Sequence, residues 1–119
     1  MSFHTHLEQV LKDVEGSVSC SIMGFDGMAV ETRQSSEPGV DLPAMLVEYG
    51  NILVKLREAA KTLEAGSVNE VAISTDKLCT IARFLSPEYF LVLALTPEGN
   101  FGKGRYALRV AAPKVKAEL

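Results

Sequence analysis

The stretch Ser17–Thr32, SVSCSIMGFDGMAVET, predicts the element around which the rest of the chain is organised. Val18, Cys20 and Ile22 alternate with serines, which is the period of two expected for a strand with one apolar face turned inward. Asp26-Gly27 then supplies a tight turn, because glycine adopts positive φ without a steric penalty and aspartate tolerates the left-handed region. The alternation resumes after the turn. We therefore expect a β-hairpin. The same alternation and turn occur in many unrelated β proteins, so this pattern indicates no function.

The composition is that of an ordinary globular domain. The 119 residues are 47% hydrophobic and 23% charged, which provides enough apolar material for a core and does not indicate disorder. We expect one domain over residues 1–119, with a short charged tail over residues 114–119. The formal net charge of −3 argues against nucleic-acid binding, which usually needs a basic face. The longest apolar run, Phe90–Leu95, is too short for membrane insertion, and the N-terminus lacks a signal-peptide pattern. We therefore expect a cytoplasmic protein.

Three helices and three further strands complete the expected set of elements. The helices are expected at Phe3–Glu15, Leu42–Ala65 and Phe101–Ala112, and the strands at Val68–Ser74, Leu78–Leu85 and Tyr89–Leu95. Asp41 and Asn100 are N-cap candidates, and Pro113 is expected to end or kink the third helix. Because Tyr89–Leu95 is apolar at every position, it should be a central strand covered on both faces. The predicted fold class is α/β (α+β): a single five-stranded, mainly antiparallel sheet sandwiched by helices, in the order α-β-β-α-β-β-β-α.

The long second helix carries more apolar surface than a single sheet-packing stripe needs. The stripe comprises Leu42, Leu46, Tyr49, Leu53, Leu56, Ala60 and Leu63. Met45, Ile52 and Ala59 extend it on one flank, and Val47, Gly50 and Val54 lie beyond the other flank. A helix that only covers a sheet needs an apolar arc of about 100° or somewhat more, so the surplus must pack on something else or be exposed. Gly50 indicates either close approach of another backbone or a tolerated glycine.

No cluster of cysteines or histidines predicts a metal site. Cys20 and Cys79 are expected to be small buried side chains that stay reduced, and a disulfide between them would require neighbouring strands. His4 and His6 are two residues apart, so they point to different sides of a helix. We interpret both histidines as exposed residues at a frayed helix end.

The glycine-rich segment 99–105 is the strongest candidate for a nucleotide-binding motif, and it does not fit one. Gly104 follows Lys103 at the position where a P-loop needs Ser or Thr to contact magnesium. The favoured interpretation is that glycines let the last helix lie close to the sheet. No hydrolase or metalloprotease motif is present, so we expect no catalytic site, no cofactor and no metal, and the chain is predicted not to be an enzyme.

Two segments give the chain a resemblance to the roadblock family. The apolar strand that leads into Gly24–Val30 (GFDGMAV) resembles the family's hairpin, and Asn100–Pro113 (NFGKGRYALRVAAP) resembles its glycine- and arginine-rich last helix. The chain is similar to the stand-alone bacterial members of this dynein-light-chain type. The resemblance implies a helix-covered sheet related to the longin and profilin-like folds. It also implies homodimerisation, a scaffold or activating role toward small Ras-like GTPases, and no nucleotide binding by the domain itself.

The resemblance and the apolar surplus together place two hypothetical surfaces. The dimer interface is expected to comprise the edge strand and part of the second helix: Val68, Asn69, Glu70, Val71, Ala72, Ile73, Gly50, Met45 and Ile52. GTPase binding is expected at Val47, Glu48, Asn51, Val54, Lys55 and Glu58. Val47 and Val54 could equally lie between two subunits. The alternative function is a small-molecule-sensing module of similar shape, with a ligand pocket on the sheet and no GTPase partner.

Overall fold

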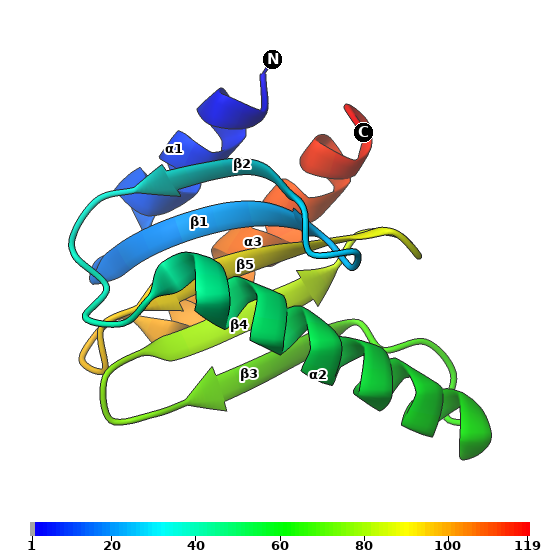
Figure 1. Cartoon of the computed structure of the whole chain (residues 1–119). Helices are drawn as coiled ribbons and strands as arrows, with labels where there is room; N and C mark the ends of the chain where they lie inside the picture. Colours follow the sequence, from blue (N-terminus) through cyan, green and yellow to red (C-terminus); the bar gives the residue numbers. More distant parts are fainter. Residues whose placement is uncertain (1) are drawn as a thin grey trace.

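Five strands form one antiparallel sheet in the computed structural model, which describes residues 2–119 (Figure 1). The strands are β1 (Ser17–Gly24), β2 (Ala29–Gln34), β3 (Glu70–Ser74), β4 (Cys79–Phe84) and β5 (Tyr89–Leu95). Their order across the sheet is β2-β1-β5-β4-β3, so β5 is central and β2 and β3 are the edges. The predicted fold class, the element order and the central position of Tyr89–Leu95 are confirmed.

Helices cover both faces of this sheet. The helices α1 (Phe3–Asp13) and α3 (Phe101–Lys116) lie side by side on one face, and α2 (Leu42–Thr62) crosses the other face (Figure 1). The predicted N-caps are both present. The Asp41 carboxylate accepts a hydrogen bond from the Ala44 amide, and the Asn100 side chain accepts one from the Lys103 amide.

The core is divided into two layers by β5. Every residue from Phe90 to Leu95 is at most 2% exposed. Leu91, Leu93 and Leu95 face α1 and α3, whereas Phe90 and Val92 face α2. Burial of a side chain of this size contributes about 1.5–3 kcal/mol. The side chains of β5 therefore contribute to the packing of helices on both faces of the sheet.

The hairpin forms as predicted, but β1 is buried on both faces rather than on one. Gly27 has a φ of +91°, and the Asp26 carboxylate accepts a hydrogen bond from the Met28 amide, which closes the turn. Ser19 and Ser21 are buried because β1 lies beside the central strand. Ser21 accepts a hydrogen bond from the Thr32 hydroxyl at 3.1 Å, which satisfies one buried oxygen on the α2 side.

Several element ends differ from the prediction. The N-cap of α1 is Ser2, and this helix ends at Asp13 instead of Glu15. In the same way α2 ends at Thr62 instead of Ala65, and β3 begins at Glu70 instead of Val68. Backbone pairing nevertheless extends one residue before β3, because the Asn69 carbonyl accepts a hydrogen bond from the Phe84 amide.

Contacts between distant segments make α3 longer and His6 more buried than the sequence predicts. Pro113 does not end α3, and the helix continues into the predicted tail, to Lys116. An interior proline costs about 3 kcal/mol, but Val115 beyond it is completely buried in the core, which offsets part of that cost. His6 is buried and lies 2.6 Å from the Glu118 carboxylate, so the interpretation of this residue as frayed and exposed is wrong. His4 is exposed as predicted.

The two cysteines are both free and cannot form a disulfide. Cys20 lies on β1 and Cys79 on β4, and β5 separates the two strands. Cys20 is completely buried, and burial raises the pKa of its thiol to about 12. Cys79 is half-buried at the start of its strand, where burial also raises the pKa of its thiol.

The close packing of α3 predicts opposite effects for two glycine substitutions in one helix. A Cβ atom at Gly104 would lie 3.0 Å from Ile81 Cδ1 and 3.2 Å from Leu93 Cδ2, whereas one at Gly102 meets nothing within 4 Å. Gly104→Ala should therefore lower the free energy of unfolding by about 1–3 kcal/mol through overpacking. Gly102→Ala should raise it by up to about 1 kcal/mol through helix propensity. Urea denaturation of both variants measures the difference, and equal effects would show that α3 does not lie against the sheet as described.

The different burial of the two thiols predicts different rates of chemical labelling. In the native protein at neutral pH, a maleimide should modify Cys79 at least about tenfold faster than Cys20, because only the thiolate reacts and Cys20 is both inaccessible and protonated. Mass spectrometry of digested samples measures both rates. In denaturant the two cysteines should react at similar rates, and fast native labelling of Cys20 would contradict its placement.

Candidate interaction surfaces on α2 and β3

Only the first half of α2 lies on the sheet. Its buried residues are Leu42, Leu46, Gly50 and Leu53, and no residue after Leu53 in this helix is buried. Leu56 is 39% exposed and Leu63 is 76% exposed, so the predicted sheet-packing stripe stops short of both. Figure 1 shows the reason, because the C-terminal half of α2 extends past the edge of the sheet. These leucines therefore remain available for another contact.

Gly50 faces the protein's own sheet and not a partner. A Cβ atom at this position would lie 3.3 Å from the ring atoms Cε1 and Cζ of Phe90. The close approach indicated by this mid-helix glycine is therefore an approach to an aromatic ring of β5, and Gly50 is removed from the hypothetical interface. Met45 is also partly buried in the protein's own core, because it packs against two groups of buried residues between α2 and the sheet.

An apolar row on α2 borders the β3 edge. The row continues from Met45 at helical spacing, and Met45 packs against a cluster that includes Leu78, at the turn between β3 and β4. On β3, Val71 is half-buried against the cluster beneath α2, and Ile73 shares its side of the strand. We call this region the edge surface. It comprises Ile52, Leu56 and Ala59 of α2, the C-cap residue Leu63, and Val71 and Ile73 of β3.

The outer side of β3 has no backbone partner within the described chain. Within residues 2–119, β3 pairs with β4 alone, from Glu70 opposite Arg83 to Ser74 opposite Cys79. Glu70 and Ala72 point to the α3 face, where Glu70 accepts a hydrogen bond from Arg105 at 2.7 Å. The structure thus brings Ile52, Val71 and Ile73 to the edge surface and places Glu70 and Ala72 on the opposite face.

A second surface lies on the side of α2 that faces away from the sheet. We call it the outer surface, and it comprises the predicted residues Val47, Glu48, Asn51, Val54, Lys55 and Glu58. All except half-buried Val54 are exposed. Val47 lies beside the β1–β2 turn, with its Cγ2 atom 3.9 Å from where a Cβ atom of Gly27 would be. The outer and edge surfaces therefore occupy different flanks of one helix.

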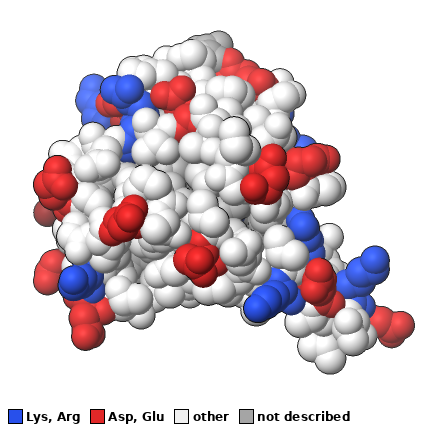
Figure 2. Space-filling model, viewed as in Figure 1, with Lys and Arg blue, Asp and Glu red and all other residues white. Residues whose placement is uncertain are grey.

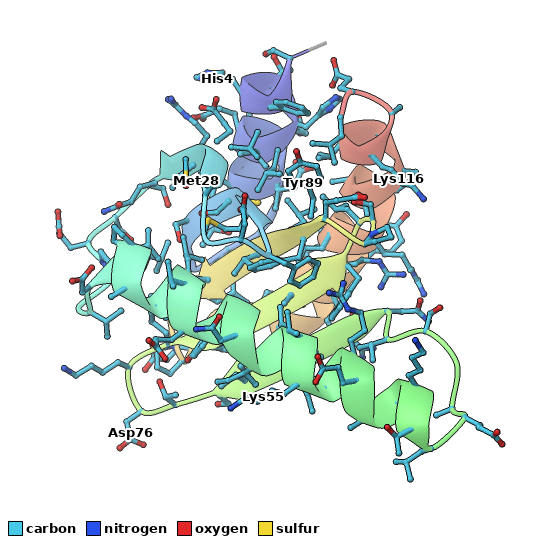
Figure 3. All side chains as sticks on the ribbon, turned by 45° about the vertical axis from the view of Figure 1, so that its right-hand side comes forward. His4, Met28, Lys55, Asp76, Tyr89 and Lys116 are labelled. Atoms are coloured by element: carbon cyan, nitrogen blue, oxygen red, sulfur yellow. The ribbon has the colours of Figure 1, made fainter. Side chains whose placement is uncertain are left out.

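The charged groups on this side of the molecule are dispersed. Figure 2 shows a mainly uncharged face with separate acidic side chains, and a mixed group of acidic and basic side chains at the C-terminal end of α2. Figure 3 places Lys55 on α2 and Asp76 at the tip of the turn between β3 and β4. This mixture resembles the rim of a protein contact more than a site for one strongly charged ligand.

Arg57 anchors the projecting half of α2, a role that the sequence analysis missed. Its guanidinium lies 4.4 Å from the Phe25 ring centroid and 6.0 Å from that of Phe84, and it donates a hydrogen bond to the Pro87 carbonyl at 3.0 Å. Phe25 also stacks against Phe90 at 4.8 Å. The only sequence signal was an aromatic residue just before the Asp26-Gly27 turn, where a solvated turn does not need one.

Metal binding and membrane spanning find no support among the described residues. No group of three or more His, Cys, Asp or Glu side chains among residues 2–119 could hold a metal ion. No helix in that range combines the length and the hydropathy needed to cross a membrane. The two α2 and β3 surfaces are therefore the candidate functional site.

Comparison with solved structures identifies the family. The crystal structure of MglC from Myxococcus xanthus has 57% sequence identity to the chain, with 100% of both chains covered and a TM-score of 0.72. A Roadblock/LC7 domain from Streptomyces avermitilis has a TM-score of 0.84 at 13% identity, covering 99% of this chain and 98% of that one. The chain belongs to the roadblock family. The resemblance noted in the sequence is thereby confirmed.

A third roadblock-type structure shares the fold at low sequence identity. MglB, in a structure described by its tetrameric arrangement, has a TM-score of 0.85 at 15% identity and covers 96% of this chain and 85% of its own. Neither a family model nor a curated protein sequence matches the chain.

Proposed function

We propose that this roadblock protein is a cytoplasmic homodimeric scaffold that binds a small Ras-like GTPase. The observation that carries the proposal is the edge surface, where exposed leucines of α2 border a strand with an unpaired edge. An exposed apolar row of this kind is typical of a protein contact, and an unpaired strand edge is a liability that proteins usually cover. The family adds the class of partner, because roadblock domains typically serve small Ras-like GTPases.

A two-fold dimer covers both features of the edge surface at once. Two copies of β3 can pair side by side, and the projecting halves of α2 can then pack against each other through Leu56 and Leu63. Of the predicted interface, Val68, Asn69, Val71 and Ile73 lie at this edge together with Ile52. The tetrameric MglB structure supports self-association as a property that this fold permits.

The outer surface remains free in such a dimer and is the proposed GTPase contact. It combines apolar Val47 and half-buried Val54 with charged and polar side chains, which is the composition expected of a non-obligate interface. Four of the five arginines are already engaged: Arg33 with Glu8, Arg57 with aromatic rings, and Arg83 and Arg105 with Glu70. A scaffold that positions the GTPase's own groups therefore suits this surface better than one that supplies a catalytic arginine.

The structure gives no specific support to the alternative of a small-molecule sensor. A ligand pocket on the sheet would need exposed strand residues at its centre, and β5 is buried on both faces from Phe90 to Leu95.

The dimer is tested by placing a charge in the edge surface. Leu56→Asp should convert the dimer to a monomer, because an unpaired carboxylate buried between subunits costs several kcal/mol. Light scattering at micromolar concentration should give a dimer mass for the wild type and a monomer mass for the variant. Leu56 is exposed in one subunit, so the variant should fold normally by circular dichroism. A monomeric wild type, or a Leu56→Asp protein that stays dimeric, would contradict the interface.

The GTPase contact is tested by the same substitution on the other flank of α2. Val54→Asp should keep the dimer mass and reduce the affinity for a GTP-analogue-loaded Ras-like GTPase by at least about tenfold, because it desolvates a charge in the contact. Asn51→Arg, at an exposed position on the same surface, should also reduce the affinity and should leave the fold intact. Calorimetric titration measures the affinity. Unchanged affinity in both variants would refute the α2 contact, whereas loss of the dimer in Val54→Asp would place that residue between subunits.

A further inference from the structure

The charge of α3 differs from that of the rest of the chain. This helix carries five of the twelve basic residues and none of the fifteen acidic residues, although the chain as a whole has a net charge of −3. Its solvent-facing side also exposes apolar groups, since Tyr106 is 55% exposed and Val110 is 41% exposed. Basic and apolar groups therefore share one face of the helix, on the side of the sheet opposite α2.

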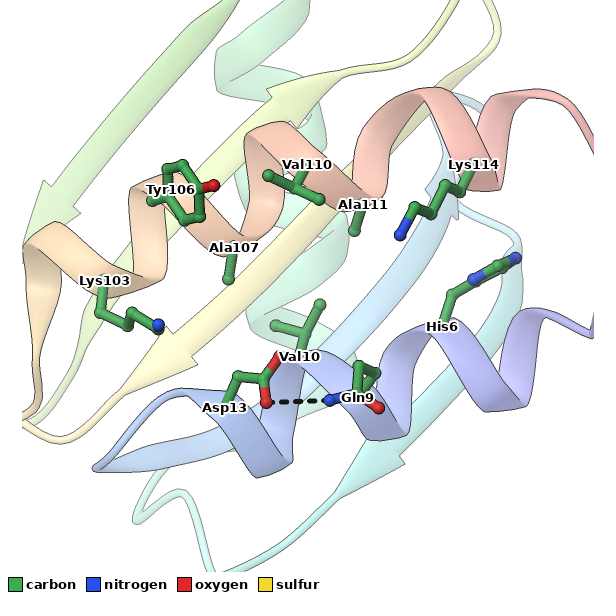
Figure 4. Close-up of a pocket in the computed structure, with 10 residues that line it drawn as sticks. All are labelled: His6, Gln9, Val10, Asp13, Lys103, Tyr106, Ala107, Val110, Ala111 and Lys114. Atoms are coloured by element: carbon green, nitrogen blue, oxygen red, sulfur yellow. Dashed lines mark hydrogen bonds between the residues drawn. The ribbon is translucent and has the colours of Figure 1, made fainter.

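A groove lies between α3 and α1 beside these groups. It has a volume of about 140 Å³, and its apolar wall includes Val10, Ala107 and Val110 (Figure 4). Lys103 and Lys114 lie toward opposite ends of the groove, both on α3. On the α1 side Gln9 donates a hydrogen bond to the Asp13 carboxylate at 2.8 Å. A groove of this size accommodates part of one or two side chains and is too small for a drug-sized ligand.

The basic side chains around this face are largely uncompensated. Among residues 2–119, Lys103, Arg109 and Lys114 have no ion-pair partner, in contrast to Arg105 with Glu70. On the flank away from α1, the guanidinium groups of Arg83, Arg105 and Arg109 surround a hollow that contains the single carboxylate of Glu70. Positive charge therefore exceeds negative charge on both flanks of the apolar row.

We propose that the exposed face of α3 binds an acidic amphipathic segment of another protein. An apolar side chain of the segment enters the α1–α3 groove beside Val110, and Tyr106 covers it from the outside. Carboxylates of the segment pair with Lys103 and Lys114 on one flank and with Arg109 on the other. Charge complementarity of this kind raises the association rate and fixes orientation, while the apolar anchor supplies most of the affinity.

The geometry favours a protein segment over an anionic membrane. The apolar groups border a groove and do not form a flat apolar surface that could enter a lipid layer. Asp13 lines the groove, and Glu15 is exposed just beyond the end of α1, so a uniformly anionic lipid surface would be repelled on this side. A peptide can place its carboxylates only where the lysines and arginines lie.

This surface is separate from the proposed dimer and GTPase surfaces. The helices α1 and α3 cover the face of the sheet opposite α2 (Figure 1). The same molecule can therefore hold an acidic segment on one face while the other face carries out the proposed scaffold function, and the test below requires neither the dimer nor the GTPase.

The experiment uses the full chain and a pair of labelled helical peptides. The probe is an amphipathic helical peptide with leucines on one face and glutamates on the other. The matched control peptide has lysine in place of every glutamate. Fluorescence anisotropy should show binding of the acidic peptide, weakened by salt, and at least about tenfold weaker binding of the basic one. Lys103→Glu/Lys114→Glu should weaken acidic-peptide binding by at least about tenfold. The control Lys55→Glu/Lys61→Glu changes the net charge equally on α2 and should have little effect.

A second variant and a direct map separate the remaining outcomes. Val110→Asp should abolish binding through loss of the apolar anchor, and amide chemical shifts of the wild type should move in α1 and α3 but not in α2. The proposal is overturned if Lys103→Glu/Lys114→Glu and Lys55→Glu/Lys61→Glu lose equal affinity for the acidic peptide. It is also overturned if the amide chemical-shift changes are confined to α2. It is also overturned if the acidic peptide does not bind at about 1 mM, or if vesicles containing phosphatidylserine bind in its place.

Discussion

Burial of β5 on both faces is the constraint on which the rest of this structure depends. A strand that is apolar at every position from Phe90 to Leu95 must be excluded from water above and below, and only helices on both sides of the sheet can achieve that. The position of β5 in the centre follows from the same requirement. Its neighbours β1 and β4 are consequently buried as well, which is why even the serines of β1 lie away from solvent.

The two faces of the sheet are covered to different degrees. Two helices lie side by side on one face, and the largest core cluster lies between them and the sheet. A single helix crosses the other face, and α2 is too long for the area that it covers, so its second half projects beyond β3 (Figure 1). Incomplete cover on this face leaves apolar side chains beside an unpaired strand. The candidate site is therefore a by-product of one helix covering a five-stranded sheet.

Features that depend on a few neighbouring residues could be predicted from the sequence. The Asp26-Gly27 turn, the Asp41 and Asn100 caps and the central strand are of this kind, since propensity and periodicity act locally. Features that depend on distant partners could not be predicted. His6 is buried because it meets Glu118 at the other end of the chain.

The candidate site follows the same division. The helical period of α2 correctly separated its outer residues from its sheet-facing residues. The helical periodicity did not reveal where α2 extends past the sheet, because that position depends on how the helix crosses the sheet in three dimensions. For this reason Leu56 was predicted to be buried and is exposed, and Gly50 was assigned to a partner although it faces Phe90. The role of Arg57 was hidden for the same reason, since both of its aromatic partners come from other elements.

The projecting half of α2 has a consequence for the dynamics of the protein. After Leu53 the helix makes no fully buried contact, and Arg57 is its last anchor to the body of the fold. A helical segment this short is only marginally stable on its own propensity, so it can open locally without unfolding of the sheet. Amide hydrogens in its last turns should exchange with solvent through that local opening. Any molecule that covers Leu56 and Leu63 would slow the exchange, so the end of α2 can report occupancy of the edge surface.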